Sequence, residues 1–246
     1  MLMFEHIGRY LLFMRKVFRR PKKTSVFFRQ TVFEFDKLGL DSLGIVAIIS
    51  VFMGAVITLQ TAYNIESPLI PKYTVGLASR DSILLEFSST IVCLILAGKV
   101  GSSIASEIGT MRVTEQIDAL EIMGINSAAY LAGPKILAMV LSVPFLVILS
   151  MGIGITGGWL AGHLSGVVPS QEYLYGILYA FNPFYVAYSV IKSIIFAFII
   201  SSVSSYWGYH TSGGALEVGR VSTKAVVTSS VLILLFNLLI TQLLLA

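Results

Sequence analysis

The sequence predicts an all-α polytopic membrane protein, with an N-terminal interfacial helix and five transmembrane helices. Its 246 residues are 56% hydrophobic and only 12% charged, with a mean hydropathy of +0.85, whereas about 25% of the residues in a soluble domain are charged. A membrane-spanning helix needs about 20 apolar residues. Four runs meet that length almost without charge: Ser42 to Ile65, Ile136 to His163, Ser193 to Leu216 and Ala225 to Ala246.

The first forty residues predict the interfacial helix. They hold nine of the seventeen Lys and Arg residues, and apolar side chains recur there at helical spacing: Phe4, Ile7, Leu11, Met14 and Phe18. Such a helix lies in the membrane interface, with its apolar side towards lipid and its basic side towards headgroups. The basic cluster follows the apolar stripe, so a cleaved signal peptide is not expected. A solvated basic tail is the alternative.

Five spans account for the apolar sequence. The expected boundaries are 43–62, 82–101, 136–162, 186–206 and 225–245. The second span reaches sufficient length only if Glu86 lies inside the membrane near one end. No polar stretch is long enough to build a second core, so residues 1–246 are expected to form one domain.

The basic residues predict the orientation, because Lys and Arg accumulate in cytoplasmic segments. With a cytoplasmic N-terminus and a C-terminus outside, fourteen of the seventeen lie in inside segments, two lie outside, and Lys192 lies within a span. The net charge of +4 therefore reflects membrane topology, and no nucleic-acid partner is expected. The single cysteine, Cys93, cannot form an intrachain disulfide.

The segment 103–124 is an acidic, amphipathic interruption between the second and third spans. On a helical wheel one face carries Glu107, Thr110, Thr114, Asp118 and Glu121, and another carries Val113, Ile117, Leu120 and Met123. A solvated loop helix and a docking helix for a cytoplasmic partner both fit this pattern. Spacing alone does not decide between them.

Two long blocks carry a resemblance to a known family. The block AGKVGSSIASEIGTMRVTEQIDALEIMGIN resembles the signature region of the MlaE-type permeases, the membrane subunits of ABC transporters that work with MCE-domain proteins. A second block, Ile191 to Ser230, is similar to the later part of the same family. The resemblance covers nearly the whole chain and agrees with five spans and a basic interfacial helix.

The resemblance implies a single permease domain, a homodimer, one cytoplasmic ATPase subunit per copy and a periplasmic MCE-domain partner. It also implies that segment 103–124 is the coupling helix, whose residues facing the ATPase would be Glu107, Arg112, Glu115, Asp118 and Glu121. The implied substrate is phospholipid. This chain would bind no cofactor, and ATP and magnesium would sit on the partner ATPase.

The chain also departs from the family pattern. Where members often carry an Arg-Glu-Leu-Gly-Pro run, this sequence reads Leu85-Glu86-Phe87-Ser88-Ser89, which keeps the acid and loses the arginine and proline. Asn237 stands where some relatives have an acidic residue. These departures put in doubt any direct transfer of the family's headgroup preference.

Charged and polar residues inside spans are candidates for the substrate pathway, because an ionisable group in hydrocarbon is usually paired or faces water. The candidates are Glu86, Thr90, Lys192 and Asn237. A structural ion pair, or snorkelling towards the interface, is the alternative for Glu86 and Lys192.

Small residues repeat at every fourth position near the end of the third span, at Gly154, Gly158, Gly162 and Gly166. They predict close helix packing, either within the subunit or at a dimer or cavity boundary. The segment Gly214 to Val221 has the glycine spacing of a phosphate loop but lacks its Lys and Ser/Thr, so it is interpreted as a turn. The histidines do not have the spacing of a metal site.

The sequence thus predicts a transport subunit, not an enzyme, in a bacterial inner membrane. The alternatives are a permease for another lipid, such as a sterol or hopanoid, and a non-transporting scaffold that recruits a cytoplasmic partner.

Overall fold

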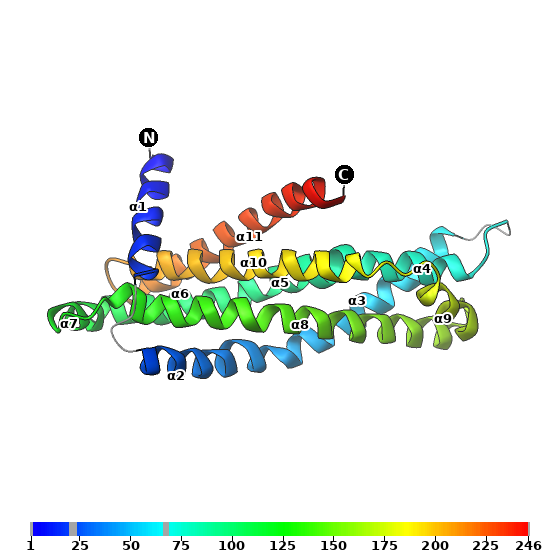
Figure 1. The fold of residues 1–246 in the computed structure, drawn as a ribbon, viewed down its shortest axis with the longest axis horizontal. Coiled ribbons are helices and arrows are strands. Elements are labelled where there is room, and N and C mark those ends of the chain that lie inside the picture. The colour runs from blue at the N-terminus through cyan, green and yellow to red at the C-terminus, as the bar shows by residue number, and fades with distance from the viewer. Residues whose placement is uncertain (1, 20–23, 66–68, 246) are drawn as a thin grey trace. The chain divides into compact units, whose positions relative to one another are not determined.

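The computed structural model describes residues 2–19, 24–65 and 69–245, and every regular element in them is a helix (Figure 1). In chain order the α-helices are α1 Leu2–Val17, α2 Thr24–Glu34, α3 Leu43–Asn64, α4 Tyr73–Ser82, α5 Val92–Leu96, α6 Ser102–Val113, α7 Gln116–Ile122, α8 Ser127–Ser165, α9 Ser170–Leu178, α10 Phe184–Tyr209 and α11 Ala215–Leu245. The π-helical segments η1 Phe35–Gly39, η3 Ile83–Ile91 and η4 Ala97–Gly101, and the 3-10 turn η2 Leu40–Ser42, join neighbouring α-helices. The predicted all-α fold class is confirmed.

Within the described residues, five helical stretches are long and apolar enough to cross a membrane, as the sequence predicts. They are Thr24–Asn64, Tyr73–Val113, Ser127–Ser165, Phe184–Tyr209 and Ala215–Leu245. A stretch of 41 residues is about 60 Å long, twice the thickness of the hydrocarbon core. The helices therefore continue well past the predicted span boundaries.

The chain forms two compact units, and both draw on α8, α10 and α11. Unit 1 contains residues 1–41, 94–142 and 195–239, and unit 2 contains residues 42–93, 143–194 and 240–246. The prediction of one permease domain stays a prediction.

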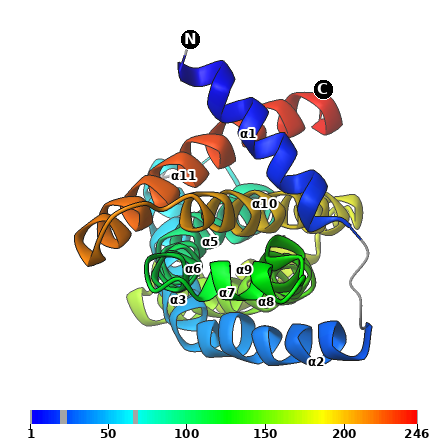
Figure 2. The same cartoon turned by 90° about the vertical axis from the view of Figure 1, so that its left-hand side faces the viewer.

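In unit 1, α1 packs across the other helices. Figures 1 and 2 show it crossing the C-terminal part of α10 instead of following it. Phe13, Met14 and Val17 are buried against Tyr206 and the start of α8. A second apolar face, with Ile7, Leu11, Leu12 and Phe18, stays exposed. This two-sided apolar character suits a helix that rests on protein while facing lipid.

The predicted interfacial region 1–40 is longer than the separate helix that the structure contains. Only α1 stands apart, because α2 continues through η1 and η2 into α3 as one stretch, Thr24–Asn64. The basic residues Arg20, Lys22 and Lys23 lie outside the described residues. Residues 24–40 thus extend the first long helix, and their place at the membrane interface stays a prediction.

The predicted single helix over 103–124 is wrong, because the segment is broken. Helix α6 ends at Val113, and Glu115 adopts a left-handed conformation with φ of 60°. Helix α7 then runs only from Gln116 to Ile122, before the turn to α8 (Figure 1). Because no glycine or proline stands at this point, the sequence carries no conventional signal for the break. The wheel drawn through 103–124 therefore does not describe one helical surface.

In unit 2, a buried arginine joins two short helices. Arg80, at the end of α4, is 1% exposed, and it donates hydrogen bonds to the carbonyl oxygens of Ile177 at 2.7 Å and Tyr179 at 2.8 Å. These carbonyls end α9, where backbone acceptors lack helical partners. Asp81 balances the charge at 2.8 Å. Arg80, one of the two basic residues in segments that the sequence predicts to lie outside, thus holds α4 against α9.

Candidate functional site

A buried ion pair in unit 2 is the first candidate site. The Lys192 ammonium on α10 lies 3.0 Å from a Glu86 carboxylate oxygen on η3 and 3.2 Å from the carbonyl oxygen of Leu85. The Lys192 side chain is completely buried, whereas that of Glu86 is 41% exposed. The two charges therefore pair, with the carboxylate as the accessible member.

Neighbouring hydroxyl groups extend this pair into a polar cluster. Thr90 donates to the second Glu86 oxygen at 3.0 Å, and Thr241 donates to the first at 3.5 Å. Tyr188 shares a hydrogen bond of 2.8 Å with Thr241, and its ring lies 4.8 Å from the Lys192 nitrogen. Glu86 and Thr90 both lie in η3, and π-helical turns are frequent at functional sites. We call Glu86, Thr90, Tyr188, Lys192 and Thr241 the intramembrane cluster.

The sequence found three members of the intramembrane cluster and missed Tyr188 and Thr241. Neither is charged, and 53 residues separate them, so no local pattern connects them. The fourth predicted pathway residue, Asn237, belongs to unit 1. Its role in a pathway stays a prediction.

The Glu86–Lys192 pair predicts an asymmetric double-mutant cycle. Glu86→Gln leaves a fully buried ammonium without its carboxylate, and we expect a loss of about 2 kcal/mol of stability. Lys192→Met leaves a carboxylate that is partly exposed and keeps Thr90, so its loss should be smaller. The double variant should recover part of the Glu86→Gln loss. Unfolding in detergent of the wild type, both single variants and the double variant gives the coupling energy. Additive losses would contradict a stabilising interaction between Glu86 and Lys192.

The second candidate site is the end of unit 1 around α6 and α7. Glu107 does not project from this surface, because it accepts hydrogen bonds from Lys37 at 2.9 Å and Lys135 at 3.0 Å. Lys135 also contacts Glu34 at 2.5 Å and is 2% exposed. These four residues, Glu34, Lys37, Glu107 and Lys135, form what we call the four-residue ion cluster. It ties α2, η1, α6 and α8 together.

Three of the other residues predicted to face an ATPase also have partners within the chain. Arg112 pairs with Asp118 at 2.6 Å across the break between α6 and α7. Glu121 accepts hydrogen bonds from Tyr209 at 2.8 Å and Ser127 at 2.9 Å, and these bonds lower the pKa of its carboxyl group. Both arrangements hold α7 in place. These side chains thus have a structural role within the chain, Asp118 and Glu121 remain at the surface, and an additional docking role for them stays a prediction.

The outward surface of α7 differs from the predicted acidic face. Glu115 is exposed at the break, and Ile122 and Met123 are 88% and 64% exposed. Ile117, which the sequence assigned to the same apolar face as Met123, is completely buried. After the turn at Glu115, the exposed positions therefore include this acid at the start of α7 and an apolar pair at its end. We call Glu115, Ile122 and Met123 the α7 tip.

The glycine series also divides in the structure. A Cβ added at Gly158 would overlap Thr58 and come within 2.5 Å of the Tyr173 hydroxyl, and one at Gly154 would lie 3.3 Å from Ile83. A Cβ at Gly162 would make only ordinary contacts at 3.7 Å. Gly166 has a φ of 69° and among the described residues meets nothing within 4 Å. It therefore serves the turn after α8, and a packing role for it at a dimer boundary stays a prediction.

The closest approach of α3 and α8 involves two glycines that the sequence did not single out. A Cβ at Gly54 would overlap the backbone of Gly154, and one at Gly157 would lie 2.5 Å from the carbonyl oxygen of Val51. Gly157 lies next to Gly158 of the predicted series, whereas Gly54 lies on α3, outside that series. The signal was present in the glycine-rich run but did not identify the facing helix.

Comparison with known proteins places this chain among transport proteins. The profile of the family described as "Permease MlaE" matches residues 31–243. A "Probable ABC transporter permease protein" of Rickettsia bellii is 38% identical over 97% of this chain and 92% of its own length. A probable ABC transporter permease protein of Synechocystis is 33% identical over 85% of this chain and 79% of its own length. "Protein TRIGALACTOSYLDIACYLGLYCEROL 1, chloroplastic" of Arabidopsis thaliana is 32% identical over 88% of this chain and 61% of its own length.

Proposed function

The chain belongs to the MlaE permease family, and from that membership we propose that it is the membrane subunit of an ABC transporter moving phospholipid between the inner membrane and a periplasmic MCE-domain protein. A separate cytoplasmic ATPase, with its ATP and magnesium, drives the transport. The subunit works as a homodimer, with its N-terminus cytoplasmic and its C-terminus periplasmic. The match over residues 31–243 carries the proposal.

A lipid substrate agrees with two further observations. The Arabidopsis relative bears the name of a glycolipid. The intramembrane cluster also offers a partly exposed carboxylate and hydroxyl groups within an apolar helical unit. Ionisable groups at such positions mark substrate pathways in many membrane proteins. We propose that Glu86, Thr90 and Lys192 line the pathway and meet the polar headgroup.

The α7 tip is the surface that we propose for the ATPase. The exposed Ile122 and Met123 at the end of α7 and the exposed Glu115 at its start combine apolar area with charge, as in a segment that docks into a groove. The Arg112–Asp118 ion pair and the hydrogen bonds that Glu121 accepts from Tyr209 and Ser127 hold this tip on α6, α10 and α8. A rigid tip can transmit movement of the ATPase to α6, and through it to the helical stretch Tyr73–Val113 that also carries Glu86.

The proposed function is tested by expressing this chain together with the proteins encoded by its neighbouring genes and purifying it. We expect an ATPase subunit to co-purify, its ATP hydrolysis in nanodiscs to rise with added phospholipid, and mass spectrometry to find phospholipid bound. If the same complex instead contained a bound sterol or hopanoid, that lipid and not phospholipid would be the substrate. A stable complex without lipid-stimulated hydrolysis or transfer would favour a scaffold.

The docking proposal predicts which substitutions release the ATPase. Because a few central residues dominate most interfaces, Ile122→Ser with Met123→Ser should weaken ATPase binding by about tenfold or more, and adding Glu115→Lys should weaken it further. All three side chains are exposed, so thermal stability should stay unchanged. Co-purification yield and a binding titration measure the effect.

A matched control uses exposed residues elsewhere in the chain. Leu164 and Leu178 are 76% and 78% exposed, and Glu172 is exposed on α9. The variant Leu164→Ser, Leu178→Ser, Glu172→Lys should bind the ATPase normally. Normal binding by the α7-tip variant would show that the ATPase contacts another surface.

A further inference from the structure

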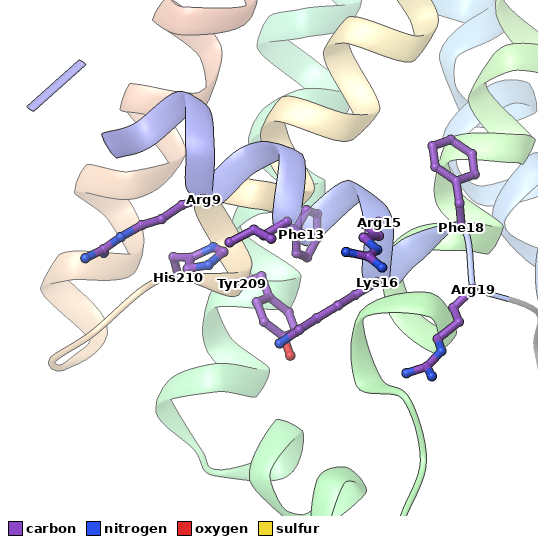
Figure 3. Close-up of a pocket in the computed structure, with 9 residues that line it drawn as sticks. Arg9, Phe13, Arg15, Lys16, Phe18, Arg19, Tyr209 and His210 are labelled. Carbon is purple, nitrogen blue, oxygen red and sulfur yellow. The ribbon is translucent and has the colours of Figure 1, made fainter. Parts of the chain in front are cut away.

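A basic pocket lies beneath α1, in unit 1. Its volume is about 700 Å³, and four cationic side chains of α1 and the residues directly after it line it: Arg9, Arg15, Lys16 and Arg19. Phe13, Tyr209 and His210 close its inner side, with the rings of Phe13 and Tyr209 centred 5.1 Å apart (Figure 3). The pocket thus combines a cationic rim with an aromatic floor.

The positive charge of the pocket is only partly balanced. Glu5 pairs with Arg9 at 2.6 Å, and Glu121 is close enough for Lys16 to contribute to the lowering of its pKa. Partial burial lowers the pKa of His210, whose Nδ1 bonds the carbonyl oxygen of Tyr206 at 3.0 Å. Arg15 and Arg19 are exposed. The rim therefore keeps an excess of cations that suits a phosphate group.

Apolar side chains at the same rim distinguish a lipid from a soluble phosphate. Leu12 and Phe18 line the pocket and are 61% and 68% exposed, and Ile7 and Leu11 continue this surface along α1. A soluble anion gains nothing from such a surface, whereas acyl chains would cover it. Cations and apolar side chains alternating on one interfacial helix are the chemistry that recognises anionic lipid.

We propose that the pocket binds the phosphate headgroup of an anionic phospholipid in the leaflet where α1 lies. The headgroup sits between the cations of α1 and the end of α10, and the acyl chains follow Leu12 and Phe18. None of its residues belongs to the intramembrane cluster, so this lipid is a resident ligand instead of the transported one. The site does not depend on the proposed transport function.

The bound lipid would also hold α7. The Tyr209 hydroxyl on the pocket floor donates to Glu121 of α7, and the Asn126 side chain donates to the Lys16 carbonyl oxygen at 2.9 Å. A headgroup that fixes Lys16 and Tyr209 therefore steadies both ends of the connection between α7 and α8.

The test is native mass spectrometry of the full chain in detergent, titrated with phosphatidylglycerol, phosphatidylcholine or inorganic phosphate. The pocket variant is Arg15→Gln, Lys16→Gln, Arg19→Gln. The control variant is Arg29→Gln, Arg220→Gln, Lys224→Gln, which removes the same charge from exposed positions of unit 1 outside the pocket.

We expect phosphatidylglycerol to bind the wild type and the control alike, and the pocket variant about tenfold or more weakly. Phe18→Ser should also weaken phosphatidylglycerol binding. Equal losses in both triple variants would reduce the effect to net charge and overturn the proposal. If inorganic phosphate competes for the pocket and Phe18→Ser has no effect, the pocket binds a soluble anion and the proposal of a lipid ligand is overturned. Unchanged binding by the pocket variant would also overturn it.

Discussion

Lys135→Met should cause a larger loss of stability than the neutralisation of any other single charged residue in this chain. The Lys135 ammonium is buried between Glu34 at 2.5 Å and Glu107 at 3.0 Å. Its removal leaves two carboxylates facing each other, one of them only 12% exposed. Breaking a buried ion pair from one side typically costs about 3–5 kcal/mol. Thermal unfolding in detergent, with Lys72→Met at an exposed position as the control, measures the loss.

A second variant separates charge from packing. Glu34→Gln combined with Lys135→Met removes one of the two facing carboxylates, and we expect it to recover part of the loss. If Lys135→Met unfolds at the wild-type temperature, the four-residue ion cluster does not stabilise the fold. The same cluster predicts that Glu107→Lys lowers stability before it affects any docking partner.

Gly54→Leu should disrupt the packing of α3 against α8 in unit 2. Even the first carbon of a side chain at Gly54 would overlap the backbone of Gly154, and backbone cannot turn aside as a flexible side chain does. Overpacking of a filled core costs roughly 1–3 kcal/mol, and a leucine against backbone should reach or exceed the upper value.

The matched control for this substitution is Gly152→Leu on α8, where among the described residues nothing lies within 4 Å of an added Cβ. It should fold normally. Monodispersity on size-exclusion chromatography after graded heating compares the two variants. Equal monodispersity of the two variants would show that the contact between α3 and α8 at Gly54 does not stabilise the fold.

The fold class followed from the sequence because hydrophobic length is a local property. Runs of about 20 apolar residues must satisfy their backbone groups internally, and helices do so without reference to the rest of the chain. The five long helices therefore needed no tertiary information. Their true lengths did, because helix continues through polar residues such as Arg80 and Glu107 where other helices pair with them.

The charged residues of the candidate sites could be identified from the sequence, but their partners could not. Glu86 and Lys192 were noticeable because an ionisable group in an apolar run is expensive. Their contact at 3.0 Å joins positions 106 residues apart, and no periodicity spans such a distance. Lys135 looked like one more basic residue at a span end, although the fold buries it among carboxylates.

The segment between the second and third spans shows the same division most clearly. The sequence by itself determined that an acidic, amphipathic stretch interrupts the apolar chain, since charge and hydrophobic period are written in its residues. The tertiary structure alone decided which side chains face outward. A left-handed residue at Glu115 turns α7 away from the axis of α6. Glu107 and Asp118, two acids that a helical wheel assigns to a partner, instead form ion pairs with Lys135 and Arg112 of the same chain. After the break at Glu115, Ile122 and Met123 are exposed together with Glu121 while Ile117 is buried, a distribution that no wheel drawn through one continuous helix predicts.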